Sequence, residues 1–506
     1  MESILMKIEE TAALYPSKEA VVGEGLSYTY EDLLLSAKAL ASHLVSVNES
    51  NKPIALYMSK TPREIVAMLA VLYSGAPYVV LDIASPADRL SVILETLDHP
   101  FVVSDQENLA AFQKEKAFDG ITSGLICYED FVKGKIDFQS LQAIRKDASS
   151  GDLAYILFTS GSTGKPKGAL ISHGNVLSYG QWFVDCFHLG QDSRLANQTP
   201  FYFSMSVSDI YGTLFSGATL YIIPRLYFSF PAKLIRYLND NRINTIYWVP
   251  SVFALIDYYD LFSFVKPLFL TTVLFAGEVM ANKHLNYFRS RVPEAHYANL
   301  FGPTETTDIC TYYKVNRSFS DGEPLPIGRA CEGLEVFLLK DGLVSKSEGE
   351  MYVAGPFVGK GYYHNEEKSR ECFVKDPRGG KKIVYKTGDL CHYNQYGELM
   401  FDGRADFQIK RHGFRIELGE IETAAITNSG LMNVVAIYDQ EKEEIVLFYE
   451  GKVGEEELRQ TLVEKVPPYM MPEHIKQVRR LIYNANGKID RHYYKDHFLE
   501  VLEKGE

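Results

Sequence analysis

The 506-residue chain is 46% hydrophobic and 23% charged, and its formal net charge at pH 7 is −13. This composition is typical of a globular protein, and the acidic balance argues against a general nucleic-acid binder, which normally presents a basic face. No run approaches the ~18 apolar residues that a membrane-spanning helix needs. Residues 1–10 contain acids and no signal-peptide core, so we expect a cytoplasmic protein without membrane insertion.

The cysteine and histidine positions indicate neither a metal site nor a disulfide framework. The six cysteines include no Cys-x-x-Cys pair, and the twelve histidines include no His-x-x-x-His pair. Both spacings are typical of structural zinc sites or redox motifs, so their absence argues against those classes. We therefore expect reduced thiols and no structural zinc.

The first 158 residues alternate between strand and helix patterns. Runs of apolar, β-branched and aromatic residues predict strands at 26–30, 53–58, 78–81, 100–104 and 153–158. Apolar residues at helical spacing predict helices at 31–44, 62–73 and 86–97. This alternation predicts a parallel sheet with helices on both faces. Residues 105–150 carry many charges with weak periodicity, and we expect a surface excursion there.

The alternation resumes after residue 194 and then changes character. Strands are predicted at 218–223, 245–249, 272–275 and 296–301, and helices at 231–239, 252–258 and 282–291. From Pro326 on, short strands between glycine turns predict a distorted β-barrel. The last hundred residues mix strands and helices again. The predicted fold class is therefore α/β, with a large N-terminal core (1–404) of doubly wound sheets plus a β-barrel, and a small mobile α+β C-terminal domain (405–506).

The segment 159–168 combines hydroxyl residues, glycines and two lysines in ten positions. Glycines let backbone N–H groups approach an anion closely, while hydroxyls add donors and lysines add positive charge. A Walker P-loop needs Ser or Thr after its lysine, but Pro166 follows Lys165, so that motif is excluded. The bland alternative is a polar hairpin tip. We interpret the segment as a phosphate-binding loop.

Three further motifs carry candidate chemistry. Residues 299–306 form a strand end, a Gly-Pro turn, a hydroxyl and a carboxylate, which suits Mg²⁺ and phosphate oxygens, although Thr and Glu also stabilise helix starts. Asp389 follows a glycine and could hold a ribose diol, or could be an ordinary turn aspartate. Lys488 sits in an Asn-Gly-Lys turn near the C-terminus, where a solvated lysine is the usual case.

The sequence TSGSTGKPKG at 159–168 resembles the signature of the adenylate-forming superfamily, which includes acyl-CoA synthetases, luciferases and carrier-loading adenylation enzymes. Matching motifs occur in the family's order across the chain, at 26–33, 73–82, 155–168, 200–211, 299–306, 349–362, 385–390, 403–422 and 486–491. Residues 275–279, 410–413 and 417–420 look most like stand-alone amino-acid-activating enzymes such as the D-alanine–carrier protein ligases.

This resemblance implies specific roles for the motif residues. The residues implied to bind ATP are Thr159, Ser160, Gly161, Thr163, Gly164, Lys167, Asn299, Phe301, Gly302, Asp389 and Arg404. Thr304 and Glu305 would hold the α-phosphate and Mg²⁺, with Glu305 as the metal ligand. Lys488 would be the catalytic lysine that bridges the substrate carboxylate and the α-phosphate. Asp406 would be the hinge about which the C-terminal domain rotates.

The resemblance also implies a substrate pocket with one departure from the family pattern. Its residues would be Phe203, Ser204, Met205, Ser208, Tyr247, Leu274, Ala276, Leu300, Asp308 and Ile309. Amino-acid-activating relatives carry an aspartate at position 204, which pairs with the α-ammonium group of the substrate. Either the substrate is an amino or hydroxy acid whose polar group is displaced from the usual α position, or it is an amino acid held by Asp308. The alternative is that Asp308 faces solvent as a helix cap and the substrate is an aliphatic or aryl acid.

The implied function is ATP-dependent activation of a small carboxylic acid, an amino acid or a related acid, as acyl-adenylate with release of pyrophosphate. The acyl group would then pass to the phosphopantetheine thiol of a separate carrier protein. An acyl- or aryl-CoA ligase is the alternative enzyme, because it shares all the nucleotide motifs. A non-catalytic nucleotide-binding protein is a third hypothesis, but Glu305, Lys488 and the glycine loop are all present.

Overall fold

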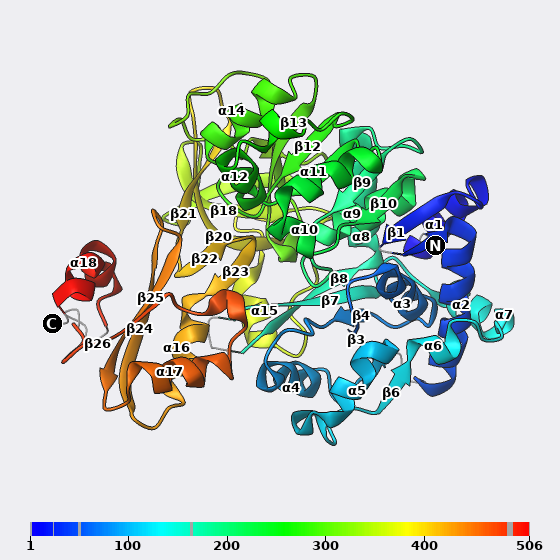
Figure 1. Cartoon of the computed structure of the whole chain (residues 1–506), viewed down its shortest axis with the longest axis horizontal. Coiled ribbons are helices and arrows are strands. Elements are labelled where there is room, and N and C mark those ends of the chain that lie inside the picture. Colours follow the sequence, from blue (N-terminus) through cyan, green and yellow to red (C-terminus); the bar gives the residue numbers. More distant parts are fainter. Residues whose placement is uncertain (1–2, 24, 49–51, 162–164, 483–488, 505–506) are drawn as a thin grey trace.

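The computed structural model describes residues 3–23, 25–48, 52–161, 165–482 and 489–504. The described chain forms two mostly parallel sheets, an antiparallel sheet and a smaller C-terminal α+β part, which is the α/β architecture that the sequence predicts. Figure 1 shows the N-terminal sheet in blue and cyan and most of the second sheet in green, although the strands from residues 19–29 at its edge are blue. The C-terminal part is orange and red and lies on the side opposite the N-terminus.

The N-terminal sheet holds four of the predicted strands and two that were not predicted, while the strand predicted at 26–30 lies in the second sheet. Its strands, in spatial order, are β6 (Gly124–Cys127), β5 (Phe101–Ser104), β3 (Ile54–Tyr57), β4 (Tyr78–Val80), β7 (Leu153–Thr159) and β8 (Lys167–Ser172). Only β8 runs antiparallel to its neighbour. The expected surface excursion at 105–150 is wrong in part, because β6 extends the sheet beside β5. A four-residue edge strand is too short to give a clear periodic signal.

The second sheet has a parallel centre with antiparallel edges. Its order is β15 (Arg329–Ala330), β14 (Thr311–Lys314), β13 (His296–Phe301), β12 (Thr272–Phe275), β11 (Thr245–Trp248), β9 (Arg194–Asn197), β10 (Thr219–Ile222), β1 (Glu19–Gly23) and β2 (Leu26–Thr29). Strands β13, β12, β11 and β9 end next to one another at one edge of the sheet. Loops that follow such ends form the usual ligand site of a parallel sheet.

Helices cover these sheets and separate them. Those of the core are α1 (Ile4–Leu14), α2 (Tyr30–Val47), α3 (Pro62–Tyr73), α4 (Ala87–Thr96), α5 (Gln106–Lys114), α6 (Tyr128–Phe131), α7 (Phe138–Asp147), α8 (His173–Phe187), α9 (Met205–Ser216), α10 (Leu226–Ser229), α11 (Pro231–Asp240), α12 (Pro250–Tyr258), α13 (Leu261–Phe264) and α14 (Asn282–Arg291). Helix α8 starts with a capping box, and it packs against α9 (Figure 1). Helix α9 was not predicted, because nearly all its residues are buried and no polar face marks its period.

The region predicted as a distorted barrel forms an antiparallel sheet. Its strands are β16 (Glu335–Lys340), β17 (Leu343–Ser345), β18 (Glu348–Ala354), β19 (Phe373–Lys375), β20 (Ile383–Tyr393) and β21 (Leu399–Arg404), with α15 (Glu366–Cys372) before β19. Asp389, expected on a tight turn, instead lies inside the long strand β20. Gly388 has a φ of +76° there, so the strand bends without ending.

The residues after β21 form their own sheets and hydrophobic clusters. Strands β22 (Gln408–Arg411) and β23 (Phe414–Glu417) make a hairpin, and β24 (Leu431–Asp439), β25 (Glu444–Gly451) and β26 (His474–Gln477) make a second sheet. Helices α16 (Leu418–Ile426), α17 (Glu455–Val463) and α18 (Arg491–Lys504) cover this sheet. In the part of the chain that is described, no helix is both long and apolar enough to cross a bilayer.

Candidate functional site

The glycine-rich segment forms the tip of the β7–β8 hairpin. Antiparallel pairing places Thr159, the last residue of β7, opposite Lys167, the first residue of β8. A strand follows the loop, whereas a helix follows a Walker P-loop. The Thr159 hydroxyl oxygen is buried without a hydrogen-bond partner among the described residues, so an oxyanion could satisfy it. Thr163 and Gly164 lie outside the described residues.

The described end of this loop contacts the C-terminal hairpin. Ser160 Oγ donates a hydrogen bond to the backbone oxygen of Arg415 at 2.8 Å and accepts one from the Glu417 N–H at 3.2 Å. The Gly161 N–H donates to Glu420 Oε2 at 3.3 Å. Residues predicted to bind phosphate are therefore joined directly to β23 and α16.

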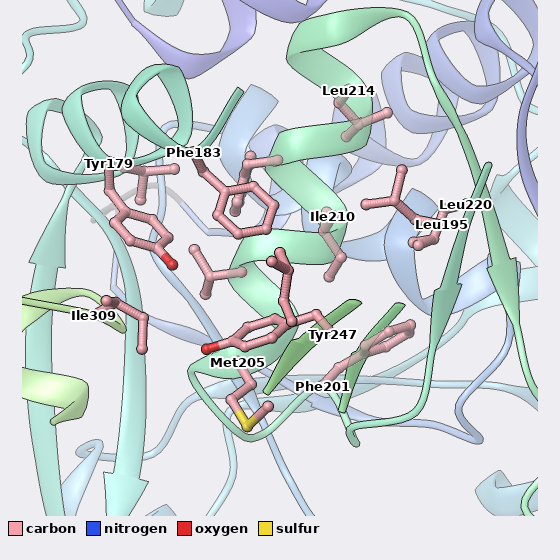
Figure 2. Close-up of a cluster of buried hydrophobic side chains, with 14 of the residues drawn as sticks. Tyr179, Phe183, Leu195, Phe201, Met205, Ile210, Leu214, Leu220, Tyr247 and Ile309 are labelled. Atoms are coloured by element: carbon pink, nitrogen blue, oxygen red, sulfur yellow. The ribbon is translucent and has the colours of Figure 1, made fainter. Parts of the chain in front are cut away.

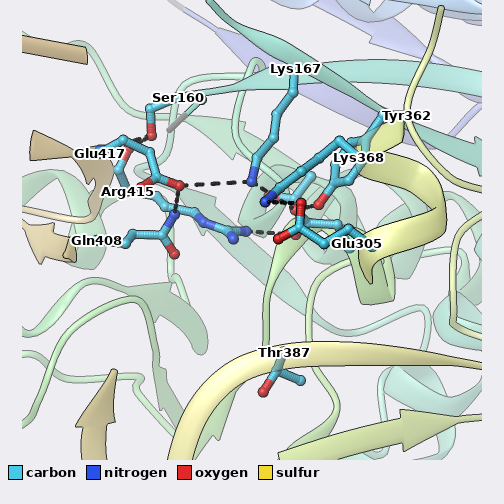
Figure 3. A network of polar contacts seen from close by, with 12 residues as sticks. Ser160, Lys167, Glu305, Tyr362, Lys368, Thr387, Gln408, Arg415 and Glu417 are labelled. Atoms are coloured by element: carbon cyan, nitrogen blue, oxygen red, sulfur yellow. Dashed lines mark hydrogen bonds and ion pairs between the residues drawn. The ribbon is translucent and has the colours of Figure 1, made fainter. Parts of the chain in front are cut away.

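Glu305 lies at the centre of a buried network of charges (Figure 3). It sits in the 3₁₀ turn η2 (Thr304–Thr306) just after β13, and its side chain is fully buried. Its Oε2 atom accepts a hydrogen bond from Arg415 Nη1 at 2.6 Å, and its Oε1 atom accepts one from the Tyr362 hydroxyl at 2.6 Å. Burial alone would raise the pKa of Glu305, but Arg415 and Lys167 outweigh it and lower the pKa to about 2.

Lys167 bridges acidic residues from two distant segments. Its Nζ atom lies 3.8 Å from a carboxylate oxygen of Glu305 and 3.8 Å from one of Glu417 (Figure 3). Burial lowers the pKa of Lys167 and the nearby Arg415 lowers it further, while the two carboxylates oppose both effects. Arg415 Nε is buried without a hydrogen-bond partner in the described part of the chain. The network therefore contains a donor that a phosphate oxygen could satisfy.

The candidate ribose-binding residues come together at the end of the antiparallel sheet. Strand pairing sets Asp389 opposite Arg404, whose Nη1 atom donates to Asp389 Oδ1 at 2.8 Å. Two further nitrogens of Arg404 donate to Asp406 at 2.6 and 2.9 Å. The predicted hinge residue is thus held by the same guanidinium that orients the predicted ribose ligand.

Asn299 and Phe301, two of the predicted nucleotide residues, lie at the end of β13. Asn299 is buried, and the ring of Phe301 lies under Lys410 Nζ, which is 4.2 Å from the ring centroid. Gly302 has no room for a side chain, because an added Cβ would lie 2.5 Å from the carbonyl oxygen of Asp308. The chain therefore turns tightly at Gly302 before it reaches the carboxylates.

The candidate pocket residues gather around the start of α9. Those buried in one hydrophobic cluster are Met205, Tyr247, Leu274, Ala276, Leu300 and Ile309. Phe203 and Ser204 precede the helix and are partly exposed, and the Phe203 ring packs against Phe414 of β23 with centroids 5.0 Å apart. The C-terminal hairpin therefore covers one side of the region where the substrate is expected.

Asp308 is buried at the inner end of this region. It is 2% exposed and starts no helix, so the alternative in which it faces solvent as a helix cap is wrong. Its carboxylate accepts hydrogen bonds from hydroxyl groups of Tyr179, Ser204, Ser208 and Tyr247. Figure 2 shows the Tyr179 and Tyr247 hydroxyls pointing toward the same space beside Ile309 and Met205. Burial raises the pKa of Asp308, and the hydroxyl groups oppose that shift.

Several residues of the site were not predicted. Arg415 and Tyr362, which bind Glu305, both lie within the motifs at 403–422 and 349–362 that matched the family. The family match could therefore have pointed to them as site residues. Glu278 also lies in such a motif, and it accepts hydrogen bonds from Gly413 N at 2.6 Å and Ser251 N at 2.8 Å. Tyr179 carried no signal, because it resembles any core residue of α8. Lys488 lies outside the described residues.

Comparison with known proteins agrees with this geometry. A profile described as AMP-binding enzyme matches residues 8–363. The chain belongs to the AMP-binding enzyme family. This adenylate-forming enzyme is 31% identical to an L-proline–[L-prolyl-carrier protein] ligase from Streptomyces coelicolor, over 96% of this chain and 95% of that protein. It is also 31% identical to a D-alanine–D-alanyl carrier protein ligase from Lacticaseibacillus casei, over 97% of this chain and 98% of the relative.

A crystal structure of IdnL1 has the same fold. It is 26% identical to this AMP-binding enzyme, with a TM-score of 0.80, and the match covers 95% of this chain and 99% of that one. The predicted family and fold class are therefore confirmed, including the region after residue 363 that the family profile does not reach.

Proposed function

We propose that this enzyme activates a small acid of the amino acid type with ATP in the cytoplasm, and then transfers the acyl group to the phosphopantetheine thiol of a carrier protein. Two relatives that match nearly the whole chain are ligases that join L-proline or D-alanine to a carrier protein. The observation that carries the proposal is the ionised, fully buried Glu305 between Arg415 and Lys167, with unsatisfied donors nearby on Thr159 and Arg415.

The chemistry requires the protein to bring two anions together. A substrate carboxylate attacks the α-phosphorus of ATP, which gives acyl-AMP and pyrophosphate, and the enzyme needs no nucleophile of its own. Thr159, Ser160 and Lys167 would bind the pyrophosphate end, together with Thr163 in the same loop. Lys488 would neutralise charge that develops between the carboxylate and the α-phosphate. A single well-placed donor of this kind contributes about 3 kcal/mol, or roughly a hundredfold in rate.

Mg²⁺ would be held by Glu305, next to Thr304. No cluster of three potential metal ligands occurs among the described residues, but Mg²⁺ is commonly bound by one or two carboxylates together with substrate phosphates. An ionised carboxylate such as Glu305 fits that requirement. When bound, the metal would offset negative charge on the phosphates.

The docked hairpin suggests which half of the reaction this arrangement serves. Arg415 Nη1 lies 2.6 Å from Glu305 Oε2, so the carboxylate proposed to bind Mg²⁺ already forms an ion pair with a cation. We assign this arrangement to thiol transfer, when pyrophosphate has left. Residues 405–506 would rotate about Asp406 between this arrangement and one in which Lys488 reaches the α-phosphate.

The first test is acid-dependent ATP–pyrophosphate exchange with the purified protein. The panel would contain α-amino acids of both hands, β-amino acids, hydroxy acids, aryl acids and short fatty acids. We expect exchange with a narrow set of small acids, followed by loading of a phosphopantetheinylated carrier protein. Exchange with no acid would overturn the proposal. Efficient release of free acyl-CoA, without carrier loading, would favour the coenzyme A ligase instead.

A further inference from the structure

Asp308 is a buried carboxylate without a cationic partner. Its side chain is 2% exposed, and no ion pair in the described structure includes it. Neutral hydroxyl groups supply all its recorded hydrogen bonds. A carboxylate removed from water is stabilised far better by a cation than by hydroxyl groups alone. Burial raises the pKa of Asp209, a second buried acid nearby, to about 8, so Asp209 is mostly protonated at neutral pH and supplies no positive charge to Asp308.

The two oxygens of Asp308 have different surroundings. Oδ2 accepts three hydrogen bonds, from Ser208 at 2.8 Å, Tyr179 at 2.9 Å and Tyr247 at 3.1 Å. Oδ1 accepts one, from Ser204 at 3.1 Å. Because each carboxylate oxygen can accept about two hydrogen bonds, Oδ2 is saturated and Oδ1 retains an open position.

The open oxygen faces the side of the site where the acid would be activated. Ser204 Oγ accepts a hydrogen bond from Thr304 Oγ1 at 3.5 Å, and Thr304 is the neighbour of Glu305. Ser204 and Thr304 are both partly exposed, whereas Ser208, Tyr179 and Tyr247 are fully buried. Ser204 contacts both Thr304 and Asp308 Oδ1, so a ligand whose carboxylate lies at Thr304 would lie next to this open oxygen. The apolar side chains of Met205 and Ile309 lie nearby (Figure 2).

We propose that Asp308 Oδ1, together with Ser204 Oγ, binds the ammonium group of the acid substrate, which is therefore a small amino acid. This inference rests on the proposed function, because the position of the substrate carboxylate comes from it. The ammonium would supply the missing positive charge, and it would replace no existing hydrogen bond of Oδ2. The other possibility is that Asp308 only orders the four hydroxyl groups and contacts no ligand.

The experiment compares Asp308→Asn with Tyr179→Phe, using the best amino acid substrate and its analogue without the amine. Tyr179→Phe is the matched control, since it removes a hydroxyl from the same carboxylate but leaves the charge. We expect Asp308→Asn to lower kcat/KM for pyrophosphate exchange with the amino acid by about 100-fold, on the scale of a broken buried charge pair. The analogue should change less than about fivefold, and Tyr179→Phe should keep the wild-type ratio of the two acids. Equal losses for both acids in Asp308→Asn, or efficient use of the analogue by the wild type, would overturn the proposal.

Two further measurements separate this proposal from the function on which it rests. In the first, the shift in Tm caused by each acid is measured with a non-hydrolysable ATP analogue present, so that no turnover is needed. The amino acid should raise the Tm of the wild type but not that of Asp308→Asn. An equal rise in both proteins would contradict the anchor, whereas no rise in the wild type with any acid would count against the proposed function instead. In the second, Ser204→Asp is added to Asp308→Asn. This variant should recover exchange with amino acids whose amine lies nearer the carboxylate, and recovery with amine-free acids would reject the assignment.

Discussion

Glu305 is ionised although its side chain is fully buried, because Arg415, Lys167 and Tyr362 surround it. These three partners come from β23, β8 and the segment before α15, so no local sequence feature brings them together. A buried charge of this kind has two consequences. Removing it deprives Arg415 of its ion pair and leaves Lys167 with Glu417 alone, and protonating it removes the attraction to both cations.

Glu305→Gln should abolish most adenylation and also destabilise the fold. We expect pyrophosphate exchange to fall about 100-fold or more, and the free energy of unfolding measured with urea to fall by about 3–5 kcal/mol, the usual cost of breaking a buried pair. The control is Glu366→Gln, since Glu366 pairs with Arg370 on the surface and both side chains are more than three-quarters exposed. The control should change neither quantity measurably. A wild-type rate of pyrophosphate exchange in Glu305→Gln would show that Glu305 is not part of the active site.

The same carboxylate predicts a pH dependence of stability. Its pKa is about 2 in the folded protein, below the ordinary value of 4.5. The contribution of ionised Glu305 to the free energy of unfolding is therefore fully present above about pH 5. It is lost as the pH falls through 4.5 toward 2. The shift corresponds to about 3 kcal/mol. Urea unfolding of wild type and Glu305→Gln should show a difference that narrows over this range, and a constant difference down to pH 2 would contradict the shift.

At the scale of elements, the β22–β23 hairpin joins the C-terminal part to the core. His412 and Gly413 form its turn with φ values of 49° and 80°, the left-handed geometry of a tight two-residue hairpin. Gly413 packs so closely that an added Cβ would lie 2.7 Å from Val249 Cγ1. Glu278 accepts its N–H at 2.6 Å, and so holds the turn against the end of β12.

Glu278→Gln should weaken this docking without touching the nucleotide residues. One of the two backbone N–H groups would face an amide nitrogen, and a hydrogen bond to a charged group contributes about 1.5–3 kcal/mol. We expect thiol transfer to a carrier to fall about tenfold or more, while pyrophosphate exchange stays within about threefold. Glu443→Gln is the control, because Glu443 is exposed beside His412 at 3.7 Å. Equal loss of both half-reactions would argue against a role for the docked hairpin in thiol transfer.

At the scale of the whole molecule, the hydrophobic clusters separate at the proposed hinge. The largest cluster reaches Leu399, and the clusters of the C-terminal part begin at Ile416. Between them the described contacts are mostly polar, such as those of Ser160 with β23 and of Glu305 with Arg415. An interface of this kind can open and close at less cost than a continuous apolar core.

Lys488→Ala should therefore slow adenylation strongly but leave thiol transfer nearly unchanged. Without the lysine, acid-dependent pyrophosphate exchange should fall about 100-fold, because the developing charge loses one cation. Transfer to a carrier from acyl-adenylate supplied in the assay should stay within about threefold of the wild type. Rapid-quench measurement of each half-reaction tests this, and a matching loss in both halves would contradict the proposed rotation.

Sequence patterns correctly predicted the helices and strands whose apolar residues follow a clear periodic spacing. Strands β12 and β13 and helix α14 begin and end at the predicted residues, because each is an apolar or amphipathic run bounded by turn residues. The patterns failed for α9, which is buried on all sides, and for the edge strand β6. Gly388 was interpreted as a turn, yet β20 continues through it, since neighbouring strands hold a bent strand together.

The sequence alone determined the family and the residue types at each motif, because the glycine loop, the Gly-Pro-Thr-Glu turn and the terminal lysine lie in an order that chance does not produce. It also showed that position 204 lacks the expected acid. Only the tertiary structure decided where charge is balanced. It placed Arg415 on Glu305 and enclosed Asp308 among four hydroxyl groups from α8, β11 and the start of α9. Burial and long-range contacts set those energies, and no local pattern in a sequence records them.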